Sequence, residues 1–523
     1  MAQRKRARLA LLGLLLAAGL LLMLLYAARK TGYHVDELYT YELANYPGGF
    51  YALQDGYLDA WQDGALFASA LHPAQPFDYS IPWNNQKIDV HPPLYYCLVY
   101  TAESLLPGLG LPWVGLVPNF LCLLAGAAVL YAAARRLTGR FWVSWLAAAV
   151  FLLNVGTQGM ALLTRMYALL MLETLLLAAA HLSLFRTVQS GGRPHWVWLA
   201  LAAATMAGAL TQYFFLVFCF FFCGLFGLWL LAQKRWRTAL AYAAAEFGGL
   251  AAAYLAFPTM KTHIFGGARG QQALGSFFSL SALGDWAASV GRVLALLGGQ
   301  FGGAALWAFL LLLAAGILYK KGCRLRGDAV FAAMLALAGA LYILAINKAA
   351  PFEADRYYVM IYGPLILAGA AVAARLAALY PKAEPLLALA VLVPVLSAHL
   401  TVGNGYLYTQ YAGRAPALEE TASLPAVVLN AAGYEVAPDL FLPEFARREA
   451  VYQVAVATDP AEGLRDAAET GALDDGFVVY GYTWDTAELL TLIEETLDVA
   501  SAELLTDVAR CPVYLVEIKT GEN

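Results

Sequence analysis

The sequence predicts an all-helical membrane protein followed by a small α/β domain, and three observations support this fold class. Of the 523 residues, 61% are hydrophobic and 13% are charged, about half the charged fraction of an ordinary soluble domain. The apolar residues form runs long enough to cross a hydrocarbon core of about 30 Å as helices. Residues 401–523 carry 21 acidic and 6 basic side chains, which leaves 16 acidic and 27 basic ones for residues 1–400. The two parts therefore belong to different environments.

The first apolar run covers residues 9–27 and follows a basic cluster at residues 4–8. Its length exceeds the apolar core of a signal peptide, so we expect an uncleaved helix with a cytoplasmic N-terminus. Cleavage near Ala27 is the alternative. Ten further runs bring the expected total to about eleven helices, and they cover residues 112–134, 141–160, 164–185, 196–211, 213–232, 238–257, 302–319, 328–346, 357–378 and 384–400.

The short basic loops between these runs fix the expected orientation. They contain Arg135, Arg136 and Arg140; Arg186 and Arg193; Lys234, Arg235 and Arg237; Lys320, Lys321, Arg324 and Arg326; and Arg375 with Lys382. Every one of these loops falls on the side of the N-terminus, as the positive-inside rule requires. An odd number of spans then places residues 401–523 outside the cell. This pattern predicts a multi-pass protein of the cytoplasmic membrane.

Two external stretches interrupt the series of spans. The first, residues 29–111, is rich in Tyr, Trp, Pro and Asp, and a loop of that length is expected to fold or to carry function. The second, residues 258–299, includes the amphipathic segment 277–296, which predicts an interfacial helix. We therefore expect a transmembrane domain over 1–400, with 29–111 as a folded loop on the membrane surface.

Residues 401–523 show a different pattern. Short β-rich runs at 426–429, 450–456, 477–482 and 513–518 alternate with helical segments such as 485–497. This alternation predicts an extracytoplasmic α/β domain with a partly parallel sheet. Because the domain has no glycine-rich phosphate loop and no nucleophile elbow, we expect it to act as a structural or partner-binding cap.

An acidic pair, Asp36 and Glu37, follows the first apolar run, with His34 beside it. Carboxylates at a membrane surface are costly unless they are solvated or used. One interpretation is a solvated loop start. The other is a general base at the water–lipid boundary, where partial desolvation raises the pKa of a carboxyl group toward neutrality.

A second motif closes the first loop and reads Asp89-Val90-His91-Pro92-Pro93-Leu94-Tyr95-Tyr96. Prolines are tolerated in the first turn of a helix, so this string predicts a helix that begins here and contains both tyrosines. Asp89 and His91 would then lie at the helix N-terminus, which favours anions such as phosphate. The alternative is that Asp89 simply caps the helix.

Two arginines stand at the expected outer ends of later spans. Arg165 precedes Tyr167, and Arg356 precedes Tyr357. An arginine at the hydrocarbon edge is often only an anchor. Because both arginines converge with the acids of the first loop on one membrane face, they instead suggest chemistry on a phosphate-bearing lipid.

The cysteines and the basic residues exclude other classes. The six cysteines have no spacing of a disulfide framework or a zinc site, and Cys219 and Cys223 are expected to pack in a helix or face lipid. The Lys and Arg excess lies in short loops between apolar runs, so no nucleic-acid partner is expected.

Taken in their order and spacing, these motifs resemble the bacterial GT-C type multi-spanning glycosyltransferases of the protein O-mannosyltransferase-like superfamily, over residues 8–400. The resemblance implies an enzyme that moves a sugar, with inversion, from a polyprenyl-phosphate carrier to an acceptor at the outer membrane face. It implies that Asp36 is the base and that Glu37 shapes the site. It further implies that the donor and its phosphate are bound by Arg165, Arg356, Tyr357, His91, Tyr95, Tyr96 and Tyr167.

Several points stay open at this stage. The sugar is a hexose or a pentose, and the acceptor is a glycan, a lipid or a protein of cell-envelope glycan biosynthesis. The sequence identifies no cofactor with certainty. Asp89 and His91 could bind either a divalent metal ion or the acceptor. The alternatives are a lipid or sugar transporter or flippase, although we find no internal repeat, and a polysaccharide polymerase or ligase.

Overall fold

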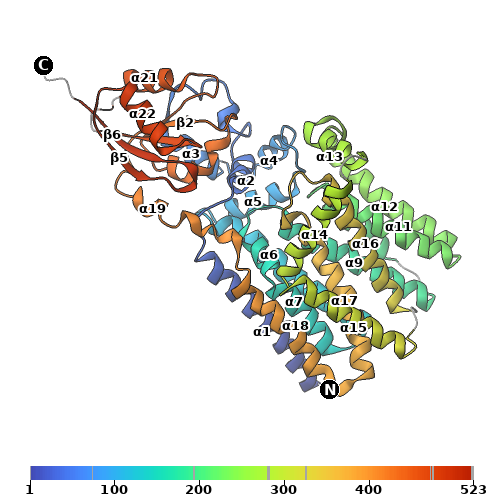
Figure 1. Cartoon of the computed structure of the whole chain (residues 1–523). Coiled ribbons are helices and arrows are strands. Elements are labelled where there is room, and N and C mark those ends of the chain that lie inside the picture. The colour runs from blue at the N-terminus through green and yellow to red at the C-terminus, as the bar shows by residue number, and fades with distance from the viewer. Residues whose placement is uncertain are drawn as a thin grey trace. The chain divides into compact units, whose positions relative to one another are not determined.

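We analysed a computed structural model of the chain, which describes residues 2–73, 75–192, 195–279, 283–323, 327–471, 473 and 476–519 (Figure 1). Arg193, Arg324 and Arg326, which belong to the expected basic loops, lie outside these residues. The chain forms two compact units. The helical unit contains residues 1–28, 89–95 and 116–404, and the sheet unit contains residues 29–88, 96–115 and 405–523.

The helical unit is built from apolar helices, as the hydrophobic runs predict. Its helices are α1 (Ala2–Ala27), α6 (Trp113–Thr138), α7 (Phe141–Leu153), α8 (Val155–Leu162), α9 (Tyr167–Ser190), α10 (Val197–Ala209), α11 (Phe214–Ala232), α12 (Trp236–Ala256), α13 (Ala268–Phe278), α14 (Leu283–Gly299), α15 (Ala304–Lys320), α16 (Asp328–Ala349), α17 (Tyr362–Leu379) and α18 (Glu384–Thr401). Short turns η2 (Thr262–Gly266), η3 (Asp355–Tyr357) and η4 (Val359–Ile361) connect some of them.

Among the described residues, eight helices are long and apolar enough to cross a membrane, or ten if each of two bent pairs counts as one span. One pair is α7 and α8, between which the chain bends by 50°. The bend falls at Asn154, whose side chain accepts from the Thr157 N–H and donates to the Val150 carbonyl. The apolar helix α10, with 13 residues, is shorter than a full span. These elements confirm a polytopic helical membrane protein, with eight to ten candidate spans in place of the eleven expected, because α10 is too short to count as one.

The second external stretch differs from its expectation. A single helix over 277–296 is predicted, but α13 ends at Phe278 and α14 begins at Leu283. Helix α14 then meets α15 at 86°. By length and composition, α14 and α15 together form a candidate broken span or re-entrant segment.

The first and last helices of the helical unit are joined by a polar contact. The His399 Nε2–H donates to the Leu153 carbonyl at 2.7 Å, so Nδ1 accepts the hydroxyl of Tyr26 at 2.6 Å. In a span with little water, such internal hydrogen bonds satisfy groups that lipid cannot.

The sheet unit contains one six-stranded sheet, with the order β1-β3-β2-β4-β6-β5. Its strands are β1 (Trp61–Asp63), β2 (Ala426–Asn430), β3 (Ala450–Gln453), β4 (Phe477–Tyr482), β5 (Val499–Thr506) and β6 (Val513–Ile518). Strand β2 pairs in parallel with β3 and with β4, and the other pairings are antiparallel. The partly parallel sheet is as predicted, whereas β5 and β1 were not expected.

The sheet unit also contains helices, and two of them, α21 (Pro460–Thr470) and α22 (Thr486–Thr496), bury the apolar core of the sheet. The others are α2 (Val35–Asn45), α3 (Gly64–Leu71), α4 (Ser80–Asn85), α19 (Arg414–Ala417) and α20 (Leu442–Phe445), while α5 (Leu94–Leu105) starts in the helical unit and continues here. Val427, Val479 and Val516 of the strands pack with Leu464 of α21 and Ile493 of α22. Because β1 comes from the first loop and pairs with β3, this loop and the C-terminal region form one compact unit.

Candidate active site

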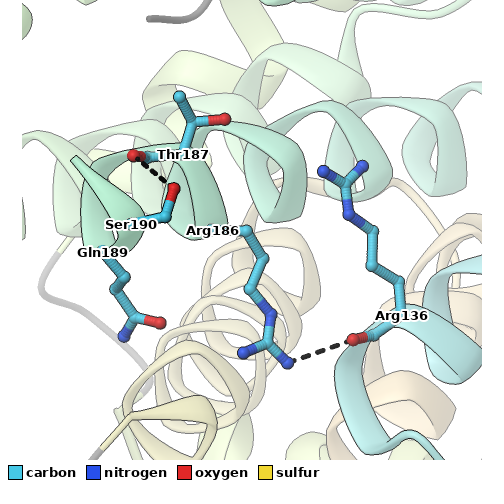
Figure 2. A pocket seen from close by; sticks show the side chains of 5 residues that line it. All are labelled: Arg136, Arg186, Thr187, Gln189 and Ser190. Carbon is cyan, nitrogen blue, oxygen red and sulfur yellow. Dashed lines mark hydrogen bonds between the residues drawn. The ribbon is translucent and has the colours of Figure 1, made fainter. Parts of the chain in front are cut away.

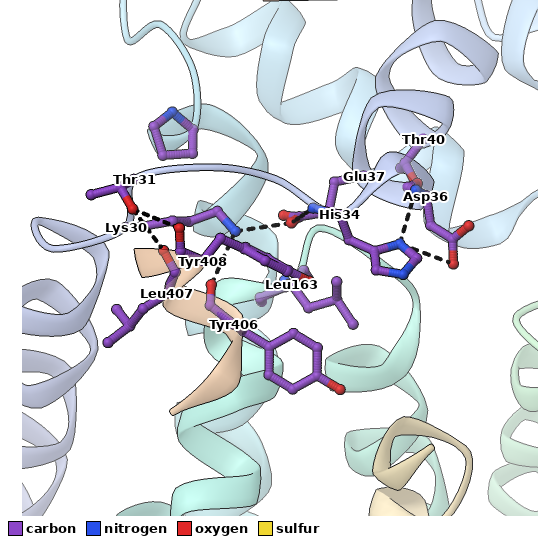
Figure 3. A network of polar contacts seen from close by, with 12 residues as sticks. Lys30, Thr31, His34, Asp36, Glu37, Thr40, Leu163, Tyr406, Leu407 and Tyr408 are labelled. Atoms are coloured by element: carbon purple, nitrogen blue, oxygen red, sulfur yellow. Dashed lines mark hydrogen bonds and ion pairs between the residues drawn. The ribbon is translucent and has the colours of Figure 1, made fainter. Parts of the chain in front are cut away.

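The acidic pair lies at the start of α2 in the sheet unit, where His34 caps the helix (Figure 3). The Nδ1 of His34 accepts from the Asp36 N–H at 3.1 Å. The Glu37 carboxylate returns to the N–H of His34 at 3.0 Å and completes a capping box. One carboxylate of the pair is thus part of the helix terminus.

Glu37 also forms an ion pair with Lys30, in which Nζ lies 2.9 Å from Oε1. The side chains of both residues are almost completely buried. Burial lowers the pKa of Lys30 although the carboxylate beside it opposes that shift. The side chain of Asp36 is instead 25% exposed. Of the two acids, Asp36 therefore has a carboxylate that solvent and an acceptor can reach, which is the arrangement a general base requires.

Residues 30–34 are held by a segment of the C-terminal region that the sequence did not point to. The Thr31 N–H donates to the Leu407 carbonyl at 2.9 Å, and its hydroxyl donates to the Tyr408 carbonyl at 2.8 Å (Figure 3). The ammonium of Lys30 lies 4.7 Å from the ring centroid of Tyr408. No local pattern in the sequence signals this pairing, because its two halves are 376 residues apart.

A second acid of α2, Glu42, is buried opposite Asp439 in the same unit. The N–H of Tyr51 donates to Glu42 at 2.8 Å. Burial raises the pKa of Glu42 to about 8, and burial beside Glu42 raises the pKa of Asp439 well above its ordinary value. These two carboxyl groups cannot both be ionised at neutral pH, so the pair holds a proton.

In the helical unit, Asp89, His91 and Arg165 form one chain of polar contacts. The ring of His91 donates from Nδ1 to Asp89 Oδ2 at 2.8 Å, and Arg165 Nη2 lies 3.3 Å from His91 Nε2. Burial raises the pKa of Asp89, but His91 and Arg165 outweigh it, so that the pKa is lowered. The guanidinium beside Nε2 disfavours a metal ion on this histidine and favours an anion.

Arg165 is 4% exposed, and side chains around it fix its backbone. The Tyr95 hydroxyl donates to Asn119 Oδ1 at 2.8 Å, and the Asn119 amide donates to the Leu163 carbonyl at 2.7 Å. The Leu163 carbonyl also accepts from the Arg165 N–H at 2.7 Å. Tyr95, expected at the donor, thus positions the segment that carries Arg165.

Tyr96 follows Tyr95 on α5 but belongs to the sheet unit. Its side chain is completely buried. A direct role of Tyr95 or Tyr96 in donor binding stays a prediction.

The segment with Arg356 lies against the start of α9. The ring of Tyr357 lies 6.3 Å from that of Tyr167 and 5.5 Å from that of Phe214. The Thr174 hydroxyl of α9 donates to the Met360 carbonyl at 2.8 Å. Since Tyr167 and Tyr357 adjoin the two arginines in sequence, the structure brings the Arg165 and Arg356 segments together.

The sequence does not point to three further side chains beside these segments, those of Gln300, Tyr362 and His263. Gln300 donates to Asp355 at 2.5 Å and accepts from the hydroxyl of Tyr362. His263 Nδ1 lies 2.8 Å from the hydroxyl of Tyr213, one residue before Phe214. A single histidine or glutamine in an apolar run does not predict which residue it contacts. The fold is needed to identify these neighbours.

A separate hollow of about 450 Å³ lies at the far end of α9 and is lined by Arg136, Arg186, Thr187, Gln189 and Ser190 (Figure 2). Arg186 donates to the Arg136 carbonyl at 3.0 Å and pairs with Asp328 at 2.8 Å. Because α9 has 24 residues, it is about 36 Å long. This hollow is thus distinct from the cluster at Arg165.

No family model and no curated protein matches the sequence. Solved structures do match. ArnT from Cupriavidus metallidurans in the apo state is similar with a TM-score of 0.59 and 15% identity, over 97% of this chain and 98% of that one. ArnT bound to undecaprenyl phosphate is similar with a TM-score of 0.56 and 14% identity, over 96% and 97% of the two chains.

The archaeal oligosaccharyltransferase AglB from Archaeoglobus fulgidus is similar with a TM-score of 0.46 and 12% identity, over 94% of this chain and 71% of that one, a level that supports no conclusion. The match to ArnT extends over nearly the full length of both chains and includes the sheet unit. This chain therefore has the overall fold of ArnT.

Proposed function

We propose that this protein is an inverting glycosyltransferase that moves a hexose or pentose from a polyprenyl-phosphate carrier to a glycan, lipid or protein acceptor. The reaction takes place at the outer face of the cytoplasmic membrane, with the N-terminus in the cytoplasm. The observation that carries the proposal is the Arg165 cluster at the start of α9, next to the Arg356 segment.

That cluster suits a phosphate monoester or diester of a lipid. Arg165 is positively charged, buried and already oriented by His91, and a preoriented guanidinium can bind two phosphate oxygens at once. The fold supports the same ligand class, because ArnT has been solved bound to undecaprenyl phosphate. Tyr357, whose ring packs against the buried ring of Tyr167, supplies aromatic surface beside Arg356 for the sugar or the lipid chain.

The proposed chemistry needs a base and a stabilised leaving group. The carboxylate of Asp36 takes the proton of the acceptor hydroxyl, and the acceptor oxygen forms a bond to the anomeric carbon. The bond from that carbon to the phosphate oxygen breaks, and the carrier leaves as polyprenyl phosphate. Arg165 and Arg356 balance the charge that grows on the departing phosphate.

Replacement of Asp36 tests the proposal. A positioned general base contributes about 10²–10⁴ in rate, so Asp36→Asn should lower kcat by that factor with donor binding retained. Asp55→Asn, an exposed substitution of the same kind in the same unit, is the matched control. Wild-type turnover in purified Asp36→Asn would exclude Asp36 as the base, and Glu37 or Asp89 would be tested next.

The proposed orientation has its own test. Single cysteines at positions 140 and 404 should react with a membrane-impermeant thiol reagent from opposite sides of sealed vesicles, because the basic loops mark the cytoplasmic side. Reaction of both from the same side would overturn the orientation and the placement of the reaction at the outer face.

A further inference from the structure

A second polar cluster lies inside the helical unit, where α9, α10, α11 and α12 pack together. His181 of α9, Cys223 of α11 and Glu246 of α12 place their imidazole nitrogen, sulfur and carboxylate oxygen within 4.8 Å of one another. All three helices are candidate membrane spans. Ionisable side chains at such a depth are expensive, and they usually have a partner or a function.

The imidazole of His181 is oriented for a ligand. Its Nδ1 lies 2.9 Å from the Leu177 carbonyl, which can only accept, so Nδ1 carries the proton and Nε2 has the free lone pair. Nε2 is the atom that points toward Tyr242 and Glu246, at 2.9 and 3.5 Å. A histidine that binds a metal ion usually donates its other N–H to a carbonyl or carboxylate in this way.

The carboxylate of Glu246 is held in the same manner. The Thr205 hydroxyl donates to Oε2 at 2.5 Å. The other oxygen, Oε1, is buried, and no hydrogen bond from a described residue reaches it. The Tyr242 hydroxyl lies 3.2 Å from the Cys223 carbonyl and can donate its single proton there. A cation at Nε2 requires the Tyr242 hydroxyl, 2.9 Å away, to donate to the Cys223 carbonyl, and the lone pairs of Nε2 and Oε1 then both face the cation.

We propose that His181, Cys223 and Glu246 bind a zinc ion inside the helical bundle. Sulfur, imidazole nitrogen and carboxylate oxygen are the ligands that zinc prefers. Cys223 gives up its thiol proton to solvent on binding, and thiolate plus carboxylate then balance the two positive charges of the ion. The complex is neutral, which reduces the cost of burying each charge.

The ion would join three helices that the sequence does not link locally. The ligands are spread over residues 181–246 and show no zinc-motif spacing, so the sequence alone predicts only that Cys223 packs in a helix or faces lipid. The site is distinct from the Arg165 cluster, since His181 stands 14 residues into α9 from Tyr167, about 21 Å along the helix. Its proposed role is to stabilise the bundle.

Cobalt binding by the full-length protein tests the site, because Co²⁺ bound to a thiolate has a charge-transfer band in the near ultraviolet. Reduced protein in detergent, freed of metal by a chelator, should take up one equivalent of Co²⁺ with this band, and Zn²⁺ should displace it. Cys223→Ser should abolish the band, and His181→Gln and Glu246→Gln should weaken cobalt binding at least tenfold. Cys122→Ser, another buried cysteine, should leave the titration unchanged.

The change in Tm on addition of Zn²⁺ is a second test, which also applies to variants that fold poorly. Zn²⁺ should raise the Tm of the wild type and of Cys122→Ser, but not that of Cys223→Ser. If wild-type protein shows no thiolate band with Co²⁺ and no Tm shift with Zn²⁺, the three side chains form an internal hydrogen-bonded cluster only, and the proposal is overturned.

Discussion

Asp89 in the helical unit and Glu42 in the sheet unit are both shielded carboxyl groups, but their neighbours differ. Asp89 contacts His91 and lies near Arg165, and its pKa is lowered. Glu42 faces Asp439, and its pKa is raised to about 8. The first carboxyl group has a lowered pKa because His91 and the Arg165 guanidinium are next to it, whereas the second shares a proton with another acid.

The difference separates residues suited to catalysis from residues suited to structure. A buried ionised group next to an arginine forms part of a fixed charge pattern that an anion can join. A protonated carboxyl pair forms a hydrogen-bonded link whose strength depends on pH. Glu37 is a third case, since it forms an ion pair with the buried Lys30. Substitutions at these sites test how far each group depends on its neighbours.

The largest effect is expected on removal of the cation from the Lys30–Glu37 pair. Lys30→Met leaves a buried carboxylate without its counter-ion, which typically costs about 3–5 kcal/mol. The Tm in detergent should fall strongly, while the exposed Lys87→Met should have little effect. Adding Glu37→Gln to Lys30→Met should recover part of the loss, and an additive loss would show that the ion pair is not the cause.

Removal of the arginines should weaken donor binding. Charge-assisted phosphate contacts contribute about 1.5–3 kcal/mol, so Arg165→Ala and Arg356→Ala should each raise the KM for a polyprenyl-phosphate sugar about ten- to a hundredfold. Lysine at either position should restore charge without the two-pronged contact and recover only part of the affinity. Arg292→Ala, which removes an exposed arginine paired with Glu353, is the control. Normal donor binding in both alanine variants would identify the arginines as interfacial anchors.

The carboxyl pair predicts that the protein loses stability as pH rises. A carboxyl group with a raised pKa in the folded state stabilises the fold fully below its unfolded pKa, about 4.5, and this stability is lost as the pH approaches 8. The expected loss is at least about 1.4 kcal/mol, the equivalent of one pKa unit. The Tm measured from pH 5 to 8 should fall less steeply in Glu42→Gln than in the wild type and in the exposed control Glu469→Gln. Equal slopes would mean that the pair does not share a proton.

The smallest effect is expected at Tyr95. Tyr95→Phe removes one hydrogen bond to Asn119, worth about 1 kcal/mol, and loosens the segment that holds Arg165. The KM for the donor should rise about fivefold, with kcat nearly unchanged. An increase as large as that of Arg165→Ala would indicate that Tyr95 contacts the donor itself.

The sequence predicted features that depend on local patterns. Apolar runs gave the helices, alternating β-rich runs gave four strands of the sheet, and the histidine–proline string gave the start of α5 at Leu94. The different roles of Asp36 and Glu37 were harder to predict from the sequence. Both are acids in the same helix turn, and only the position of Lys30 separates a buried ion pair from a partly exposed carboxylate.

Long-range partners were beyond the sequence for a physical reason. The carboxyl pair of Glu42 and Asp439 forms only after the sheet unit has packed. The cluster of His181, Cys223 and Glu246 forms only after three helices have packed. Strand β1 has three residues, too few for a recognisable alternation, and it forms because β3 offers an edge. A single sequence contains no signal for such pairings beyond the residue types themselves.

Strand β1 also has a consequence for the order in which the protein is made. The Trp61–Asp63 segment and the Tyr51 hydroxyl leave the ribosome early, but their partners in β3, including Gln453 at 402 residues from Tyr51, are translated near the end. Chain segments usually fold as domains in the order of synthesis. The pairing of β1 with β3 must therefore wait until every membrane span has been synthesised. The sheet thereby closes last and is complete only in a chain that has been synthesised through to β6.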